Sequence, residues 1–151
     1  MKIISVSGSY SQIGKTTLAR KIRKFLSDDF KVYVFKIGHG RDNPNKEEKL
    51  FIDLEKGVSY IKELEEKKNY DFLIVESNSV LNHIKPDLAL FLMGNKKGQK
   101  KTSELAFKKA DIIIDNNFNT DASSKIIKEK LNCDSFGEIL LEQSNYINKN
   151  D

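Results

Sequence analysis

A run of small and polar residues near the start of the chain has the spacing of a phosphate-binding loop. It covers Gly8–Thr17 and has the sequence GSYSQIGKTT. Such a loop needs a small residue, four variable residues and then Gly-Lys-Ser/Thr, because consecutive backbone N–H groups must curl around a phosphate without side-chain clashes. Gly14, Lys15 and Thr16 match the second half, and Ser9 takes the first small position. The pattern predicts a P-loop.

The chemistry of this loop assigns roles to its residues. Lys15 is expected to reach the β- and γ-phosphates of a nucleoside triphosphate and to act in catalysis, while the Thr16 hydroxyl is expected to bind Mg²⁺. The alternative is a glycine-containing loop with a solvated lysine. The remaining predicted contacts to the nucleotide in this loop are Ser11, Gln12, Ile13, Gly14 and Thr17.

The segments on either side of the loop favour the phosphate site. The β-branched run 2–7 precedes the loop and fits a buried strand. Apolar residues at helical spacing follow the loop, and Ser27–Asp29 should end that helix. A strand, a loop and a helix in this order would place the positive helix N-terminus at the anion site.

A carboxylate later in the chain provides a second metal contact. Apolar residues of the stretch 70–75 are followed directly by Glu76. This is the Walker B form, in which an acid at a strand tip holds the hydration shell of Mg²⁺ beside the P-loop. The alternative is a buried strand that merely ends in an acid. We expect Glu76 to act on the metal through water.

The loop after the second predicted strand, 32–35, is a third candidate segment. Loops at the carboxyl ends of parallel strands collect ligand chemistry, and glycines flank His39 here. Arg41 could stabilise charge on a transferring phosphoryl group, which makes it a predicted catalytic residue, and Asp42 is a further candidate acid for the metal. Alternatively, this segment is a surface turn in which Arg41 pairs with Asp42.

The choice between guanine and adenine nucleotides rests on incomplete signals. A GTPase would carry Asn-Lys-x-Asp after a late strand, and the chain has Asn95-Lys96-Lys97-Gly98, without the acid. Asn116 follows another strand and is a predicted base contact. These residues alone leave both GTP and ATP open. The lysines around position 98 could meet phosphate or an acidic partner, or form a solvated basic loop.

The order of elements predicts an α/β fold with a mostly parallel sheet flanked by helices, the P-loop NTPase fold. Later strands are expected at 87–94 and 112–114. Helices are expected from Gly57, after a cap at Thr102 or Ser103, and after a cap at Thr120-Asp121. Residues 45–56 fit no single period. The tail from Ser135 could be a packing helix or an edge strand.

Composition narrows the class of protein. The 151 residues suit one domain over 1–151, and 26 Lys and Arg against 22 Asp and Glu leave a net charge of only +4. The charges are interleaved without the aromatic and basic repeats that track nucleic acid, so nucleic acid is not an expected partner. No apolar run is long enough to span a membrane, and a single cysteine forms no metal cluster. We expect a cytoplasmic protein.

Several of these segments together resemble the molybdopterin-guanine dinucleotide biosynthesis protein B family. The resemblance implies a GTP-binding accessory protein that uses Mg²⁺, hydrolyses nucleotide slowly and assists a molybdopterin nucleotidyltransferase. A homodimer is compatible with it. The same segments also resemble dethiobiotin-synthetase-like ATP-dependent enzymes and nickel-insertion GTPases, and a non-catalytic nucleotide switch is a further alternative. The segments that carry the resemblance are 8–18, 34–40, 73–79, 85–87 and 110–112.

Overall fold

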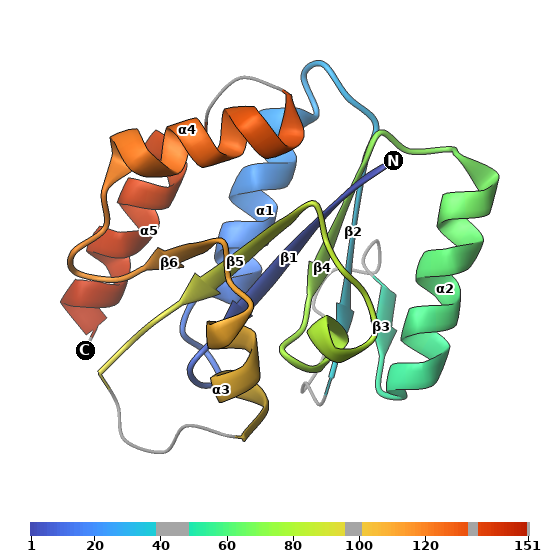
Figure 1. The fold of residues 1–151 in the computed structure, drawn as a ribbon, viewed down its shortest axis with the longest axis horizontal. Helices are drawn as coiled ribbons and strands as arrows, with labels where there is room; N and C mark the ends of the chain where they lie inside the picture. Colours follow the sequence, from blue (N-terminus) through green and yellow to red (C-terminus); the bar gives the residue numbers. More distant parts are fainter. Residues whose placement is uncertain (39–48, 96–100, 133–135, 151) are drawn as a thin grey trace.

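Six parallel strands form one sheet in the computed structural model, which describes residues 1–38, 49–95, 101–132 and 136–150 (Figure 1). The strands are ordered β3-β2-β4-β1-β5-β6. The predicted α/β fold with a parallel sheet is confirmed. The strands are β1 (Lys2–Gly8), β2 (Val32–Ile37), β3 (Lys49–Phe51), β4 (Phe72–Glu76), β5 (Leu88–Leu92) and β6 (Ile112–Ile114).

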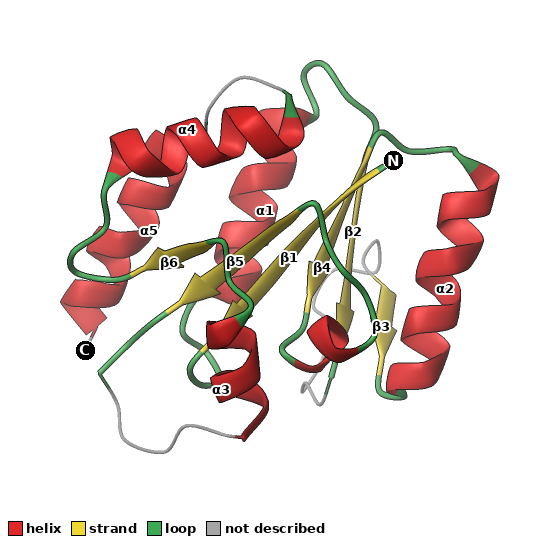
Figure 2. Ribbon diagram, viewed as in Figure 1, coloured by secondary structure: helices red, strands yellow, loops and turns green. Residues whose placement is uncertain are grey.

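Helices cover both faces of the sheet, so its central strands are buried on both sides (Figure 2). One apolar cluster joins the sheet to α1 (Lys15–Leu26), α4 (Thr120–Leu131) and α5 (Gly137–Asn150). The other joins the opposite face to α2 (Leu54–Lys67), η1 (Ser79–Asn82) and α3 (Lys101–Lys108). Two-sided burial explains why the strands read as continuous apolar runs rather than alternating ones.

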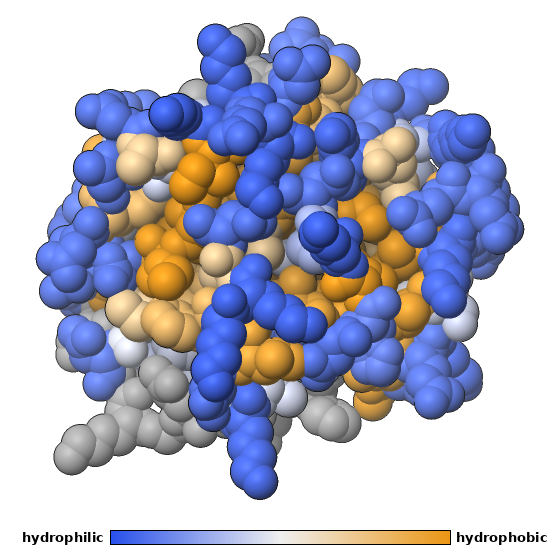
Figure 3. Space-filling view, viewed as in Figure 1, coloured by the Kyte–Doolittle hydropathy of each residue, from blue (hydrophilic) through white to orange (hydrophobic). Residues whose placement is uncertain are grey.

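Alternation along each strand divides the side chains between the two clusters. In β4, Phe72 and Ile74 pack with α1, whereas Leu73 and Val75 pack on the side of α2. Hydrophilic residues cover most of the face shown in Figure 3, and hydrophobic residues are exposed between them. No helix among the described residues is long and apolar enough to cross a membrane.

Aspartates fix the amino-terminal edge of the sheet. Each precedes a strand and accepts a hydrogen bond from a backbone N–H at the start of a neighbouring strand. The carboxylate of Asp71 accepts from the N–H of Lys31 at 2.8 Å, Asp87 from Ile3 at 2.7 Å, and Asp111 from Ala89 at 2.8 Å. These bonds satisfy backbone donors at strand ends and fix the strand register.

The boundaries of three helices differ from those predicted. Helix α2 begins at Leu54 rather than Gly57, because the Asp53 carboxylate caps it by accepting from Lys56 N–H at 3.1 Å. Helix α4 is capped by Asn119 instead of Thr120-Asp121. The cap predicted at Thr102 or Ser103 is wrong, since both residues lie within α3. The Ser103 hydroxyl binds other parts of the chain instead of capping the helix.

Two stretches without a firm prediction have defined structure. Part of 45–56 forms β3, which pairs with β2 at the sheet edge. The tail forms helix α5, so the helical alternative was right and the edge strand was wrong. Phe136, Leu140 and Ile147 of this region are buried in the cluster that contains α1.

Candidate functional site

The P-loop connects β1 to α1 at the carboxyl edge of the sheet. Its backbone takes the left-handed conformation twice, at Gln12 (φ 67°) and Gly14 (φ 104°). Helix α1 then begins at Lys15, and the Gly14 carbonyl accepts its first hydrogen bond from Leu18 N–H at 2.9 Å. The N–H groups of the first helical turn have no acceptor within the helix and face the loop, as an anion site requires.

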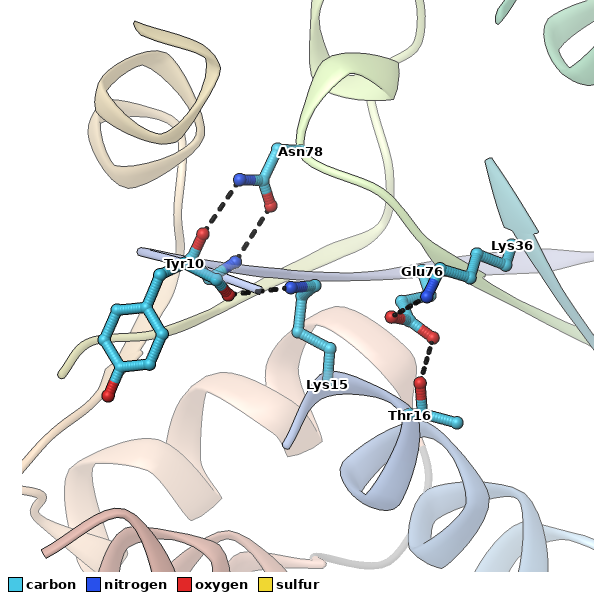
Figure 4. Close-up of polar contacts among 7 residues, drawn as sticks. Tyr10, Lys15, Thr16, Lys36, Glu76 and Asn78 are labelled. Atoms are coloured by element: carbon cyan, nitrogen blue, oxygen red, sulfur yellow. Dashed lines mark hydrogen bonds and ion pairs between the residues drawn. The ribbon is translucent and has the colours of Figure 1, made fainter. Parts of the chain in front are cut away.

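Lys15 lies across the mouth of the loop. Its ammonium donates a hydrogen bond to the backbone carbonyl of Tyr10 at 3.1 Å (Figure 4). A lysine folded over its own loop places a positive charge next to the helix N-terminus, and both favour a bound anion. The loop thus has the charge and the donors that a polyphosphate needs.

Thr16 and Glu76, predicted to share the metal, lie in direct contact. The Thr16 hydroxyl donates to Glu76 Oε2 at 2.6 Å (Figure 4). Glu76 ends β4 and is only 4% exposed. Its other oxygen, Oε1, lies 3.2 Å from the ammonium of Lys36 in β2. The buried carboxylate therefore has a hydroxyl on one oxygen and a cation on the other.

Sequence reasoning gave Lys36 no role. It is the first charged residue after an apolar run, as Glu76 is in β4, and the parallel register pairs these two residues directly. Their equal positions at the ends of two predicted strands were the available signal. Whether the strands are neighbours could not be read from either segment.

Asn78 is another residue that sequence reasoning left without a role. Its side-chain oxygen accepts from Gly8 N–H at 3.0 Å, and its amide donates to the Gly8 carbonyl at 2.8 Å (Figure 4). The same amide donates to the Ser103 hydroxyl at 3.2 Å, and that hydroxyl donates to the Ser9 carbonyl at 3.1 Å. These bonds hold the beginning of the P-loop to the segment after β4 and to α3.

Helix α5 contacts the P-loop from its other side. The Gln143 side chain is fully buried and donates to the Gly14 carbonyl at 3.3 Å, while its Oε1 atom has no hydrogen-bond partner among the described residues. The adjacent Ser144 hydroxyl donates to the Asp115 carbonyl just after β6. Helix α5 thereby joins the P-loop to the loop that carries the predicted base contact, Asn116.

The other predicted site residues fall into two groups. Within the P-loop, Ser11, Gln12 and Thr17 are exposed, and Asn116 is exposed in the turn after β6. Ile13 is 3% exposed and packs in the core, so only its backbone can contact a ligand. Arg41 and Asp42 lie outside the described residues, as do His39 and Lys96–Lys100.

The donors suit Mg²⁺ held together with a phosphate. No cluster of three or more His, Cys, Asp or Glu side chains that could hold a metal occurs among the described residues. Mg²⁺ instead commonly uses one or two protein oxygens, water and substrate phosphates. The Thr16 hydroxyl and the Glu76 carboxylate, 2.6 Å apart, fit that arrangement. These two residues would hold the ion, and the ion would supply charge neutralisation at the phosphates.

A shallow pocket of about 400 Å³ lies away from the P-loop. It is formed by β3 and α2 and lined by Phe51, Glu55, Lys56, Ser59, Tyr60 and Glu63. None of these residues belongs to the loop or contacts Glu76 among the interactions of the described residues. The pocket therefore contains none of the predicted phosphate- or metal-binding residues.

Comparisons with known proteins add little to this geometry. No family model and no curated protein matches the chain. Among solved structures, the chain is similar to one from the MinC:MinD cell division protein complex of Aquifex aeolicus, with 17% identity and a TM-score of 0.42. The match covers 87% of this chain and 65% of that one, so the chain spans less than two thirds of its neighbour. A likeness of this strength carries no argument about function.

The class of fold follows from the chain's own residues. A P-loop leads from β1 into α1, and the acid-tipped strand β4 is paired with β1 in a parallel sheet. This is the P-loop NTPase fold.

Proposed function

We propose that this protein binds a nucleoside triphosphate with Mg²⁺ at the carboxyl edge of its sheet. One observation carries the proposal: the P-loop places Thr16 at the start of α1, within 2.6 Å of the buried Glu76 carboxylate at the end of β4. The P-loop and the Walker B acid come from segments 60 residues apart in sequence. Their contact is the arrangement that phosphate and Mg²⁺ need when they bind together.

Different residues of the site bind the phosphates, hold the metal and act in hydrolysis. Lys15 exchanges its bond to the Tyr10 carbonyl for phosphate oxygens, and the N–H groups of the loop and first helical turn surround the same phosphates. Thr16 and Glu76 hold the Mg²⁺ site. Hydrolysis is slow, and its rate depends on the positive charge that Arg41 supplies to the transferring phosphoryl group. Asp42 is a further acid for the metal.

At a finer level, we propose that the nucleotide is GTP and that the protein assists a molybdopterin nucleotidyltransferase in the cytoplasm. The support is the resemblance of several segments to the molybdopterin-guanine dinucleotide biosynthesis protein B family. Two of these segments, 34–40 and 73–79, include Lys36, Glu76 and Asn78 of the candidate site. ATP-dependent synthesis and a non-catalytic switch are the alternatives, and turnover with each nucleotide separates them.

Replacement of Lys15 tests the binding proposal. We expect Lys15→Ala to lower the affinity for Mg-GTP by at least about 100-fold with the fold intact, because hydrogen bonds to charged groups contribute about 1.5–3 kcal/mol each and the residue lies at the loop mouth. Lys24→Ala is the matched control, as Lys24 is exposed in the last turn of the same helix. Isothermal titration calorimetry with GTP and ATP measures both. Unchanged affinity in Lys15→Ala would end the P-loop proposal.

The finer proposal predicts a phenotype. A strain lacking this protein should lose most activity of its molybdenum enzymes, because the cofactor would not be completed. The chain should restore that activity, and Lys15→Ala should not. Normal molybdenum enzyme activity in the deletion strain would contradict the proposed pathway role without affecting the binding proposal.

A further inference from the structure

Among the ion pairs of the described residues, the pair between Lys36 and Glu76 has the most buried acid. The Glu76 side chain is 6% exposed, whereas Asp111 in the pair with Lys130 is 24% exposed and Asp87 in the pair with Lys2 is 34% exposed. A buried carboxylate requires compensation by a cation or several hydrogen-bond donors. At Glu76 that compensation comes from the Lys36 ammonium on Oε1 and the Thr16 hydroxyl on Oε2.

The predicted metal position uses the same carboxylate, through its contact with Thr16. A hydrated Mg²⁺ held by Thr16 and Glu76 would carry its charge next to the Lys36 ammonium, which contacts the same carboxylate at 3.2 Å. Two cations held by one buried carboxylate repel each other. Both cations therefore compete for Glu76.

The Lys36 side chain can move away from the Glu76 carboxylate. Its side chain is 36% exposed although its partner is buried, so the flexible stem reaches the carboxylate from the solvent side. It lies at the end of β2, one residue before Ile37, where that strand stops. A lysine ammonium at such a position can move into water or toward a phosphate without disturbing the core.

We propose that Lys36 is a tethered cation that neutralises the Glu76 carboxylate when nucleotide is absent and is displaced when Mg²⁺ enters with the phosphates. This inference rests on the proposed function. It makes Lys36 a positioning residue that keeps the empty site ordered and weakens metal binding until the nucleotide contributes its own oxygens. The simpler possibility is a fixed structural ion pair. The two possibilities predict different changes in metal affinity when the charge of Lys36 is removed.

Mn²⁺ binding to the nucleotide-free protein, followed by electron paramagnetic resonance at pH 8, provides the test. Lys36→Met removes the charge at nearly constant size, so the competing cation is lost and Mn²⁺ should bind at least tenfold more tightly than to wild type. Lys36→Arg keeps a cation and should bind Mn²⁺ as weakly as wild type. Glu76→Gln added to Lys36→Met should abolish the gain, which locates the ion at Glu76.

Other outcomes overturn the proposal. If Lys36 only holds Glu76 in place, Lys36→Met will bind Mn²⁺ equally well or less well than wild type. Lys21→Met is the control, because Lys21 also forms an ion pair, with Glu142 at 3.1 Å, away from the loop mouth. Should Lys36→Met fold poorly by circular dichroism, Lys36→Gln keeps a hydrogen-bond donor without the charge, and the same gain is expected from it.

The experiment separates this inference from the proposed function. Calorimetry of Mg-GTP and Mg-ATP with the wild-type protein decides whether nucleotide binds at all. If nucleotide binds and the Mn²⁺ affinity of Lys36→Met does not rise, only the role of Lys36 is wrong. If wild type binds neither nucleotide, the proposed function is wrong, whatever the Mn²⁺ titration shows.

Discussion

At the scale of single residues, Gly14 meets two demands at once. Its φ of 104° lies in a region that other residues adopt only under strain. A Cβ atom at this position would lie 2.2 Å from Nε2 of Gln143, whose side chain is fully buried. The loop backbone and the packing of α5 therefore both require a residue without a side chain.

Gly14→Ala is expected to destabilise the protein and to weaken nucleotide binding together. The backbone conformation alone should cost about 1–3 kcal/mol, and displacement of Gln143 adds to it. Adding Gln143→Ala removes the clash but leaves the backbone strain, so the double variant should recover only part of the lost stability. Urea unfolding and calorimetry measure the two effects. Wild-type stability in Gly14→Ala would show that the loop does not hold this conformation.

At the scale of elements, local pattern was sufficient for most of the sheet. Apolar runs located five of the six strands, because strands covered on both faces contain few polar residues. The strand β3 was missed, since three residues carry too little periodicity to stand out. The start of α2 was misplaced because Asp53 caps it before the first clear apolar period.

Contacts between elements could not be predicted from the residue pattern of single segments. The P-loop and Glu76 could be predicted because each has its own signature within one segment. The contact of Lys36 with Glu76 depends on β2 being the neighbour of β4, and strand order is set by packing across the whole sheet. The bonds from Asn78 and Gln143 to the loop likewise join segments 70 and 129 residues apart. The roles of Arg41 and Asp42 stay predictions.

Helix α5 gives the site a support that its sequence did not reveal. Consecutive residues of this helix, Gln143 and Ser144, bind the Gly14 carbonyl and the Asp115 carbonyl. The helix also packs on α1 through the apolar cluster and pairs Lys21 with Glu142. The helix therefore links the P-loop to the turn that carries Asn116 through hydrogen bonds of two adjacent residues.

At the scale of the whole molecule, the residues of the candidate site and the residues that bind strand ends lie at opposite edges of the sheet. Its carboxyl edge carries the P-loop, Glu76 and Lys36, and its amino edge carries the three aspartates that bind strand ends. Because the strands are parallel, every strand has one end at each edge. From Ile3 to Gly8 along β1 the two edges are about 17 Å apart, at roughly 3.3 Å per residue.

Substitution of Asp87 tests whether the amino edge of the sheet affects stability without affecting nucleotide binding. Its carboxylate accepts from Ile3 N–H at 2.7 Å and lies 3.5 Å from the Lys2 ammonium, at the opposite edge from the P-loop. Asp87→Ala leaves the strand donor without that acceptor and should lower the free energy of unfolding by about 1.5–3 kcal/mol. Asp87→Asn keeps an acceptor oxygen and should cost less. Both variants should bind Mg-nucleotide with wild-type affinity, since the contacts of Asp87 with other described residues lie at the amino edge and not at the loop. Urea unfolding and calorimetry on the same samples give the two numbers. A tenfold loss of affinity in a folded Asp87→Ala protein would mean that the amino edge of the sheet controls the geometry of the P-loop.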